Sequence, residues 1–68
     1  MNLVVNGSQV ELREQATVAD VVEQVAPERG RRGTAVAVNG EVVPKKDWSG
    51  SRLSSGDRVE ILHAIGGG

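Results

Sequence analysis

The chain opens on Leu3-Val4-Val5-Asn6-Gly7-Ser8-Gln9-Val10-Glu11-Leu12, in which two short apolar runs flank an Asn-Gly pair. Asn-Gly is the strongest short signal for a hairpin because both residues tolerate a positive φ. We therefore expect a strand, a turn over Asn6-Gly7-Ser8-Gln9 and a second strand. The inward face of this hairpin should be formed by Leu3, Val5, Val10 and Leu12.

A helix should follow the hairpin, starting at Thr17-Val18-Ala19-Asp20. This segment fits a capping box, with Thr17 as N-cap and Asp20 at N3. The next apolar residues fall at helical spacing, in one stripe formed by Val18, Val21, Val22 and Val25. Valine is a poor intrinsic helix former, so this helix should depend on packing against a sheet. Pro27 should end it.

The second half of the chain reads as further strands joined by turns. The expected elements are a strand at Thr34–Val38, a turn at Asn39-Gly40, a short strand at Glu41–Val43, a helical turn at Lys45–Trp48, a turn at Ser55–Asp57 and a last strand at Arg58–Ala64. A hairpin, a helix and further strands in this order favour an α+β fold. The compact solution is the β-grasp (ubiquitin-like) arrangement, a mixed sheet with one main helix packed across one face. We expect residues 1–65 to form this domain and residues 66–68 to form a flexible tail.

Size and composition restrict the function. A chain of 68 residues is one domain with a small core, which favours a binding module or carrier over a free-standing enzyme. The net charge of −1 provides no overall attraction to nucleic acid. No apolar run approaches the roughly 20 residues that cross a membrane, and the N-terminus is not a signal peptide, so a cytoplasmic location is expected. With no cysteine and one histidine, we expect no metal site and no cofactor bound by this chain.

The chain ends in Gly66-Gly67-Gly68, and this tail has two interpretations. Three terminal glycines are often a frayed end or a linker remnant. Alternatively, the tail is the working part of the protein, because glycine has no side chain to obstruct a narrow channel. A terminal Gly-Gly can then thread into another enzyme's active site and present its carboxylate for activation.

Several segments together resemble the ThiS family, the sulfur carriers of thiamine thiazole synthesis. The resemblance is carried by Ala35-Val36-Ala37-Val38-Asn39-Gly40-Glu41-Val42-Val43-Pro44, Trp48, Leu53, Gly56-Asp57, Val59-Glu60-Ile61 and the terminal Gly-Gly. It covers essentially the whole chain, and the order and spacing are more specific than any single piece. Two departures are the third tail glycine, Gly66, and the basic loop from Arg29 to Arg32.

The resemblance implies a mechanism and a set of partners. A ThiF-type enzyme would use ATP to adenylate the Gly68 carboxylate, with Gly66 and Gly67 threading its active site. A sulfur donor such as a cysteine desulfurase would then convert the adenylate into a thiocarboxylate. Thiazole synthase (ThiG) would take the sulfur. The chain itself would be a protein cosubstrate, with no catalytic residue.

The alternation of the last strand predicts a docking surface. Val59 and Ile61 share the face assigned to the core. The opposite face should be uncovered and apolar, and docking is assigned to Val4, Ala35, Ala37, Leu62 and Ala64. The alternative is that Leu62 is half-buried at a sheet edge.

The remaining distinctive side chains favour structural roles. A lone tryptophan, Trp48, is expected to cover the core rather than to anchor a partner. His63 has no evident Ser, Cys or carboxylate relay and is expected to be a half-exposed strand residue. Arg29, Arg31 and Arg32 are interpreted as a solvated loop, although they would also suit an acidic or phosphate-bearing partner.

Three alternative functions remain open from the sequence. One is a carrier of the same class that serves molybdopterin synthesis, like MoaD, or cysteine synthesis. Another is a ubiquitin-like interaction module whose tail performs no chemistry. A third is a ubiquitin-like modifier that forms isopeptide bonds with target lysines.

Overall fold

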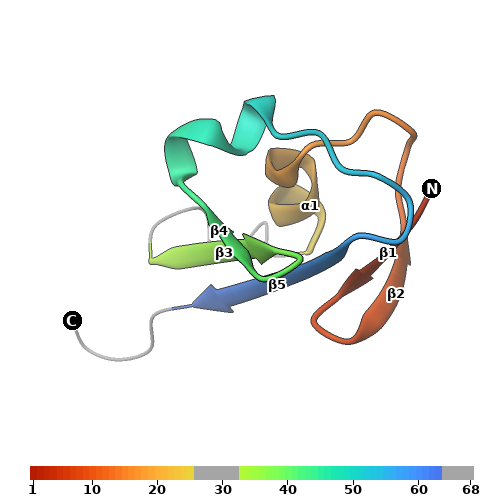
Figure 1. The fold of residues 1–68 in the computed structure, drawn as a ribbon, viewed down its shortest axis with the longest axis horizontal. Coiled ribbons are helices and arrows are strands. Elements are labelled where there is room, and N and C mark those ends of the chain that lie inside the picture. The colour runs from red at the N-terminus through yellow and green to blue at the C-terminus, as the bar shows by residue number, and fades with distance from the viewer. Residues whose placement is uncertain (26–32, 64–68) are drawn as a thin grey trace.

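The computed structural model describes residues 1–25 and 33–63, which form one mixed sheet and the helices that cover one of its faces (Figure 1). The elements in chain order are β1 (Asn2–Val5), β2 (Ser8–Glu11), α1 (Val18–Val25), β3 (Thr34–Val38), β4 (Glu41–Val43), the 3₁₀ helix η1 (Lys45–Gly50) and β5 (Arg58–His63). The expected strands, main helix and helical turn are all present.

The sheet has the strand order β2-β1-β5-β3-β4. β5 runs parallel to β1 and antiparallel to β3, while β1–β2 and β3–β4 are antiparallel hairpins. The last strand of the chain is therefore the middle strand of the sheet. This is the α+β, β-grasp arrangement expected from the order of the elements.

Both hairpins close through their Asn-Gly pairs. Asn6 and Gly7 have φ values of 50° and 84°, and Asn39 and Gly40 have φ values of 51° and 88°. Positive φ at both central residues gives a two-residue turn whose backbone twist matches the right-handed twist of the two flanking strands. In the first hairpin Val5 pairs with Ser8, so the turn is two residues long. The four-residue turn expected from the sequence is wrong, because Ser8 and Gln9 already belong to β2.

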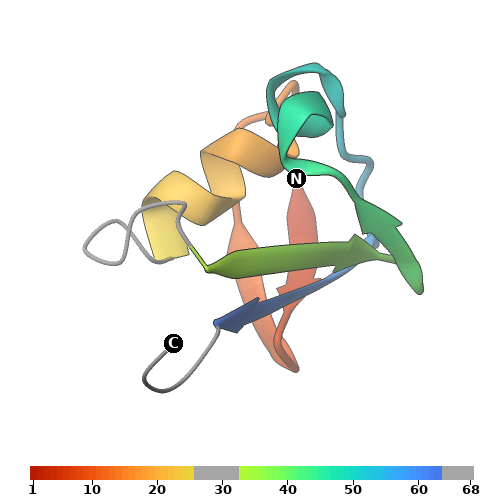
Figure 2. The same cartoon turned by 90° about the vertical axis from the view of Figure 1, so that its left-hand side faces the viewer.

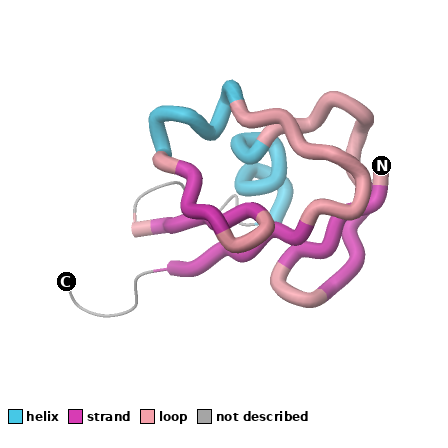
Figure 3. The backbone as a smooth tube through the Cα atoms, in the orientation of Figure 1, coloured by secondary structure: helices cyan, strands magenta, loops and turns pink. Residues whose placement is uncertain are grey.

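The core lies between the sheet and the helices, which Figures 2 and 3 show on one side of the strands. Its buried members come from every layer: Leu3, Val5, Val18, Ala19, Val21, Val22, Val36, Trp48, Leu53, Val59 and Ile61. Val10 and Leu12 are partly buried and pack against this cluster, so the expected inward face of the hairpin is confirmed. Val25 departs from the expected helical stripe, since its side chain is 42% exposed. It is the final residue of α1, one turn beyond the last buried position, Val22.

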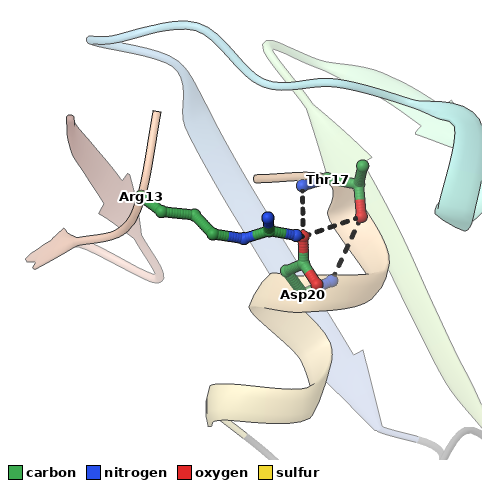
Figure 4. A network of polar contacts seen from close by, with 3 residues as sticks. All are labelled: Arg13, Thr17 and Asp20. Carbon is green, nitrogen blue, oxygen red and sulfur yellow. Dashed lines mark hydrogen bonds and ion pairs between the residues drawn. The ribbon is translucent and has the colours of Figure 1, made fainter. Parts of the chain in front are cut away.

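The capping box at the start of α1 forms as expected, and a third residue joins it (Figure 4). The Thr17 backbone N–H donates to Asp20 Oδ2 at 2.9 Å, and the Asp20 N–H donates to Thr17 Oγ1 at 3.3 Å. Arg13 Nη2 donates to the same carboxylate oxygen at 2.8 Å. The backbone hydrogen bond from Thr17, followed by the bond from Arg13, lowers the pKa of Asp20 below its usual 3.8.

The segment between β4 and β5 closes the core around Trp48. The indole is 2% exposed, and its Nε1–H donates to the Val43 carbonyl oxygen at 2.9 Å. The packing role expected for this tryptophan is confirmed. Further along, the Leu53 N–H donates to the Ala16 carbonyl at 2.9 Å, which ties the loop to the start of α1. Within residues 1–25 and 33–63, no helix is long and apolar enough to cross a membrane.

Two valines of α1 offer a direct test of this packing. Val21→Ala removes two methyl groups from a fully buried site and should lower the free energy of unfolding by about 2 kcal/mol. Val25→Ala is the matched control at an exposed site and should change it by less than about 0.5 kcal/mol. Urea unfolding followed by Trp48 fluorescence measures both. Equal losses in the two variants would contradict the assigned helix face.

The capping network predicts a dependence of stability on pH. Because the folded-state pKa of Asp20 is lowered, its contribution is complete above the unfolded-state value, near 3.8, and disappears as the pH falls through the lower folded-state value. Asp20→Asn should therefore lose stability relative to wild type at neutral pH, and the difference should shrink under acid. The effect should be modest, because solvent screens a carboxylate that is 36% exposed. Denaturation midpoints across acid pH measure it, and a constant difference down to pH 2 would contradict it.

Candidate functional site

β5 is the element that leads to the glycine tail. It lies between β1 and β3 and ends at His63, after which the chain continues toward its C-terminus (blue in Figure 1). The predicted site residues Ala64, Gly66, Gly67 and Gly68 lie outside the described residues, as does the expected domain boundary at residue 65. The structure therefore fixes the strand from which the tail departs.

The side chains of β5 alternate strictly between the two faces of the sheet. Val59 and Ile61 are 0% and 4% exposed and lie in the core beneath α1. Arg58, Glu60 and Leu62 are exposed on the other side. The core face expected from the alternation is confirmed. Leu62 is 67% exposed, so the alternative of a half-buried edge residue is wrong.

Neighbouring strands extend this surface, which we call the open face. In β3, Ala35 lies opposite Leu62 and Ala37 lies opposite Glu60. In β1, Val4 lies beside Arg58. The four described residues of the predicted docking set, Val4, Ala35, Ala37 and Leu62, therefore share one face. Among the described residues, the helices cover only the other face of the sheet (Figure 2).

The structure adds one residue to the open face that sequence reasoning missed. Val42 of β4 lies opposite Ala37, and its side chain is 74% exposed. The sequence could have predicted this position. If the Ala37 side chain points away from the core, the residue paired with it on the antiparallel neighbour must point the same way. The open face thus contains apolar side chains from four strands, together with the charged side chains of Arg58 and Glu60 on β5.

His63 lies at the end of β5 and makes a structural contact. It is half-buried, as expected, and its Nδ1 lies 3.1 Å from the Thr34 hydroxyl oxygen on β3. Across the part of the chain that the structure describes, no group of three or more His, Cys, Asp or Glu side chains is placed to hold a metal ion. The arginines of the predicted basic loop, Arg29, Arg31 and Arg32, fall in the undescribed segment 26–32.

A mixed sheet with a single packed helix, an open face and a middle strand that leads to a glycine terminus define a ubiquitin-like β-grasp protein. Within that class the sequence model of the ThiS family matches residues 3–68. The chain belongs to the ThiS family, which confirms the resemblance drawn from its sequence.

Individual relatives support this assignment over the full chain. The sulfur carrier protein ThiS of Escherichia coli is 26% identical over 68 residues, which cover all of both chains. A crystal structure of the thiamine biosynthesis protein ThiS from Geobacter metallireducens superposes with a TM-score of 0.82 at 30% identity, with both chains fully covered. A solution structure of a thiamine biosynthesis protein from the same organism gives 0.78 at 33% identity, covering the whole of this chain and 88% of that one.

One relative is a much longer protein. A thiazole synthase of Paramagnetospirillum magneticum is 34% identical over 68 residues, which are all of this chain but 20% of that protein. A domain similar to this chain therefore accounts for about a fifth of that synthase.

Proposed function

We propose that this protein is the sulfur carrier of thiamine thiazole biosynthesis and acts as a protein cosubstrate rather than as an enzyme. The observation that carries the proposal is the full-length similarity to the E. coli sulfur carrier protein ThiS, within a family match that runs to Gly68. The placement of β5 supports it, because the middle strand of the sheet leads both to the tail and across the open face.

The chemistry belongs to the carboxylate of Gly68. A carboxylate oxygen is a poor leaving group, so a ThiF-type enzyme first joins Gly68 to the α-phosphate of ATP and releases pyrophosphate. The terminal sulfur of a persulfide, supplied by a donor such as a cysteine desulfurase, displaces AMP. Cleavage of the resulting S–S bond by a thiol leaves the thiocarboxylate. We place the reaction in the cytoplasm, because its first step consumes ATP.

The tail delivers this group and the domain guides it. We assign residues 66–68 as the tail beyond a domain of residues 1–65, with Gly66 and Gly67 narrow enough to thread a partner's channel. Thiazole synthase is the proposed recipient of the sulfur. The similarity to a segment of the P. magneticum thiazole synthase supports this pairing, because a carrier-like domain is joined there to a protein of that name.

The open face is the proposed docking surface for these partners. Exposed apolar side chains gathered on one sheet face are typical of protein interaction sites. Leu62 and Val42 are the large apolar residues there, and Arg58 and Glu60 can fix the orientation of a partner through charge complementarity. Ala64 is proposed to extend the surface toward the tail.

The tail chemistry is tested by intact mass spectrometry. The protein is incubated with a ThiF-type enzyme, ATP, a cysteine desulfurase and cysteine. We expect a mass gain equal to one oxygen replaced by sulfur, localised to Gly68 by fragmentation, and no gain when Gly68 is deleted.

An unchanged mass, in a mixture that converts the E. coli carrier, would contradict the assignment to thiamine synthesis. Activating enzymes of molybdopterin and cysteine synthesis would then be tested in the same way. Conjugates on target lysines would identify a modifier, and inactivity with every enzyme would leave a ubiquitin-like interaction module.

The docking surface predicts a separate kinetic effect. Leu62→Ser should raise the KM of the adenylating enzyme for the carrier about tenfold through lost apolar burial, with little change in kcat. Val25→Ser is the matched control, because it also removes an exposed apolar side chain but lies on the helix side of the sheet. Equal KM values for the two variants would contradict docking through the open face.

A further inference from the structure

Both Asn-Gly turns place a side-chain carboxamide on β5. Asn6 Oδ1 accepts a hydrogen bond from the Ile61 N–H at 2.8 Å, and Asn6 Nδ2 donates to the Ile61 carbonyl oxygen at 3.3 Å. Asn39 Oδ1 accepts from the Arg58 N–H at 3.0 Å, and its Nδ2 donates to Asp57 Oδ1 at 3.0 Å. Glycine would satisfy the positive φ of either turn, so asparagine supplies contacts that the turns themselves do not require.

The contact made by Asn6 begins where the backbone pairing of β1 with β5 ends. β1 pairs with β5 only through Val4 with Arg58 and Val5 with Val59. The Asn6 N–H then donates to the Val59 carbonyl at 2.9 Å. At the following position on this edge, Ile61, the side-chain amide takes the place of a backbone peptide, because it offers one donor and one acceptor. Asn6 thus extends the ladder beyond the end of β1.

The other edge of β5 is held by β3, whose pairing continues to Thr34 opposite His63. The carboxamide of Asn6 therefore holds the end of β5 on its second edge, close to the point where the chain leaves the domain. Asn39 makes the corresponding contact at the opposite end of the strand, at Arg58.

We propose that Asn6 is a positioning residue for the tail: its carboxamide fixes the end of β5 and so sets the direction in which the chain leaves the domain after His63. The inference rests on the proposed function, in which Gly68 must reach a partner's nucleotide. If the end of β5 could move in the docked complex, Gly68 would be in the productive orientation for only part of the time. A fixed departure point raises that fraction, and the rate of the bound complex is proportional to it.

The test compares Asn6→Gly with Asn39→Gly. Each variant keeps a residue suited to positive φ and keeps the glycine that follows. Each removes one side-chain carboxamide that is hydrogen-bonded to β5. Adenylation of each carrier by the ThiF-type enzyme gives kcat and KM, and thermal unfolding gives the stability of each variant. Asn6→Asp is the conservative variant, because a carboxylate oxygen can still accept the hydrogen bond from the Ile61 N–H.

We expect Asn6→Gly to lower kcat about tenfold at an unchanged KM, since the open face is intact while productive orientations become rarer. Asn39→Gly should retain the wild-type kcat, and Asn6→Asp should recover part of the loss. The proposal is overturned if both glycine variants lower kcat in proportion to their loss of stability, or if neither lowers it.

A second readout separates this proposal from the proposed function. NMR relaxation and amide exchange should show a more mobile end of β5 at Ile61 and His63 in Asn6→Gly, and near Arg58 in Asn39→Gly. If the wild-type protein is not adenylated but these changes in mobility occur, the proposed function is wrong. The conclusion that the Asn6 carboxamide fixes the end of β5 is then still supported. If the end of β5 is equally ordered in Asn6→Gly and in wild type, the Asn6 carboxamide does not fix the strand. The proposal is then overturned whatever the adenylation rates are.

Discussion

The structure depends on the insertion of β5 between β1 and β3. This pairing joins the last strand of the chain to the first and the third, so each hairpin becomes part of a single sheet only through β5. Val59 and Ile61 then lie on the face that meets the valines of α1, and the core is complete. Such distant contacts are entropically costly to form, and the buried apolar surface must compensate for them. The position of β5 in the sheet therefore determines both the fold and the strand from which the tail departs.

Much of this architecture could be predicted because its signals are local. The Asn-Gly pairs predict hairpins, and the capping box from Thr17 to Asp20 predicts the start of the helix. The alternation of apolar and polar residues in Arg58–His63 assigns each side chain of β5 to a face of the sheet. The open face followed from the same alternation, since Ala35, Ala37 and Leu62 share a parity once β3 and β5 are paired. Local periodicity is informative wherever one face is buried and the other is not.

The features that escaped prediction depend on tertiary contacts. The partnership of Arg13 with Asp20 requires the position of the loop after β2 relative to α1, which no spacing rule provides. The exposure of Val25 depends on where the core ends beneath the helix rather than on the helical stripe itself. The carboxamide contacts of Asn6 and Asn39 join residues far apart in the chain. The Asn-Gly turns already gave a reason for both asparagines, so the sequence offered no sign of a second role.

The position of β5 also bears on how the protein is made. A ribosome releases the N-terminal hairpin and α1 first, but these elements lack the strand that joins them to β3 and β4. A nascent or interrupted chain without β5 has no complete core, and its open face lacks Leu62, Arg58 and Glu60. Synthesis must therefore reach β5 before the open face is complete. Under the proposed function, an unfinished chain would therefore lack the surface that we assign to docking with the activating enzyme.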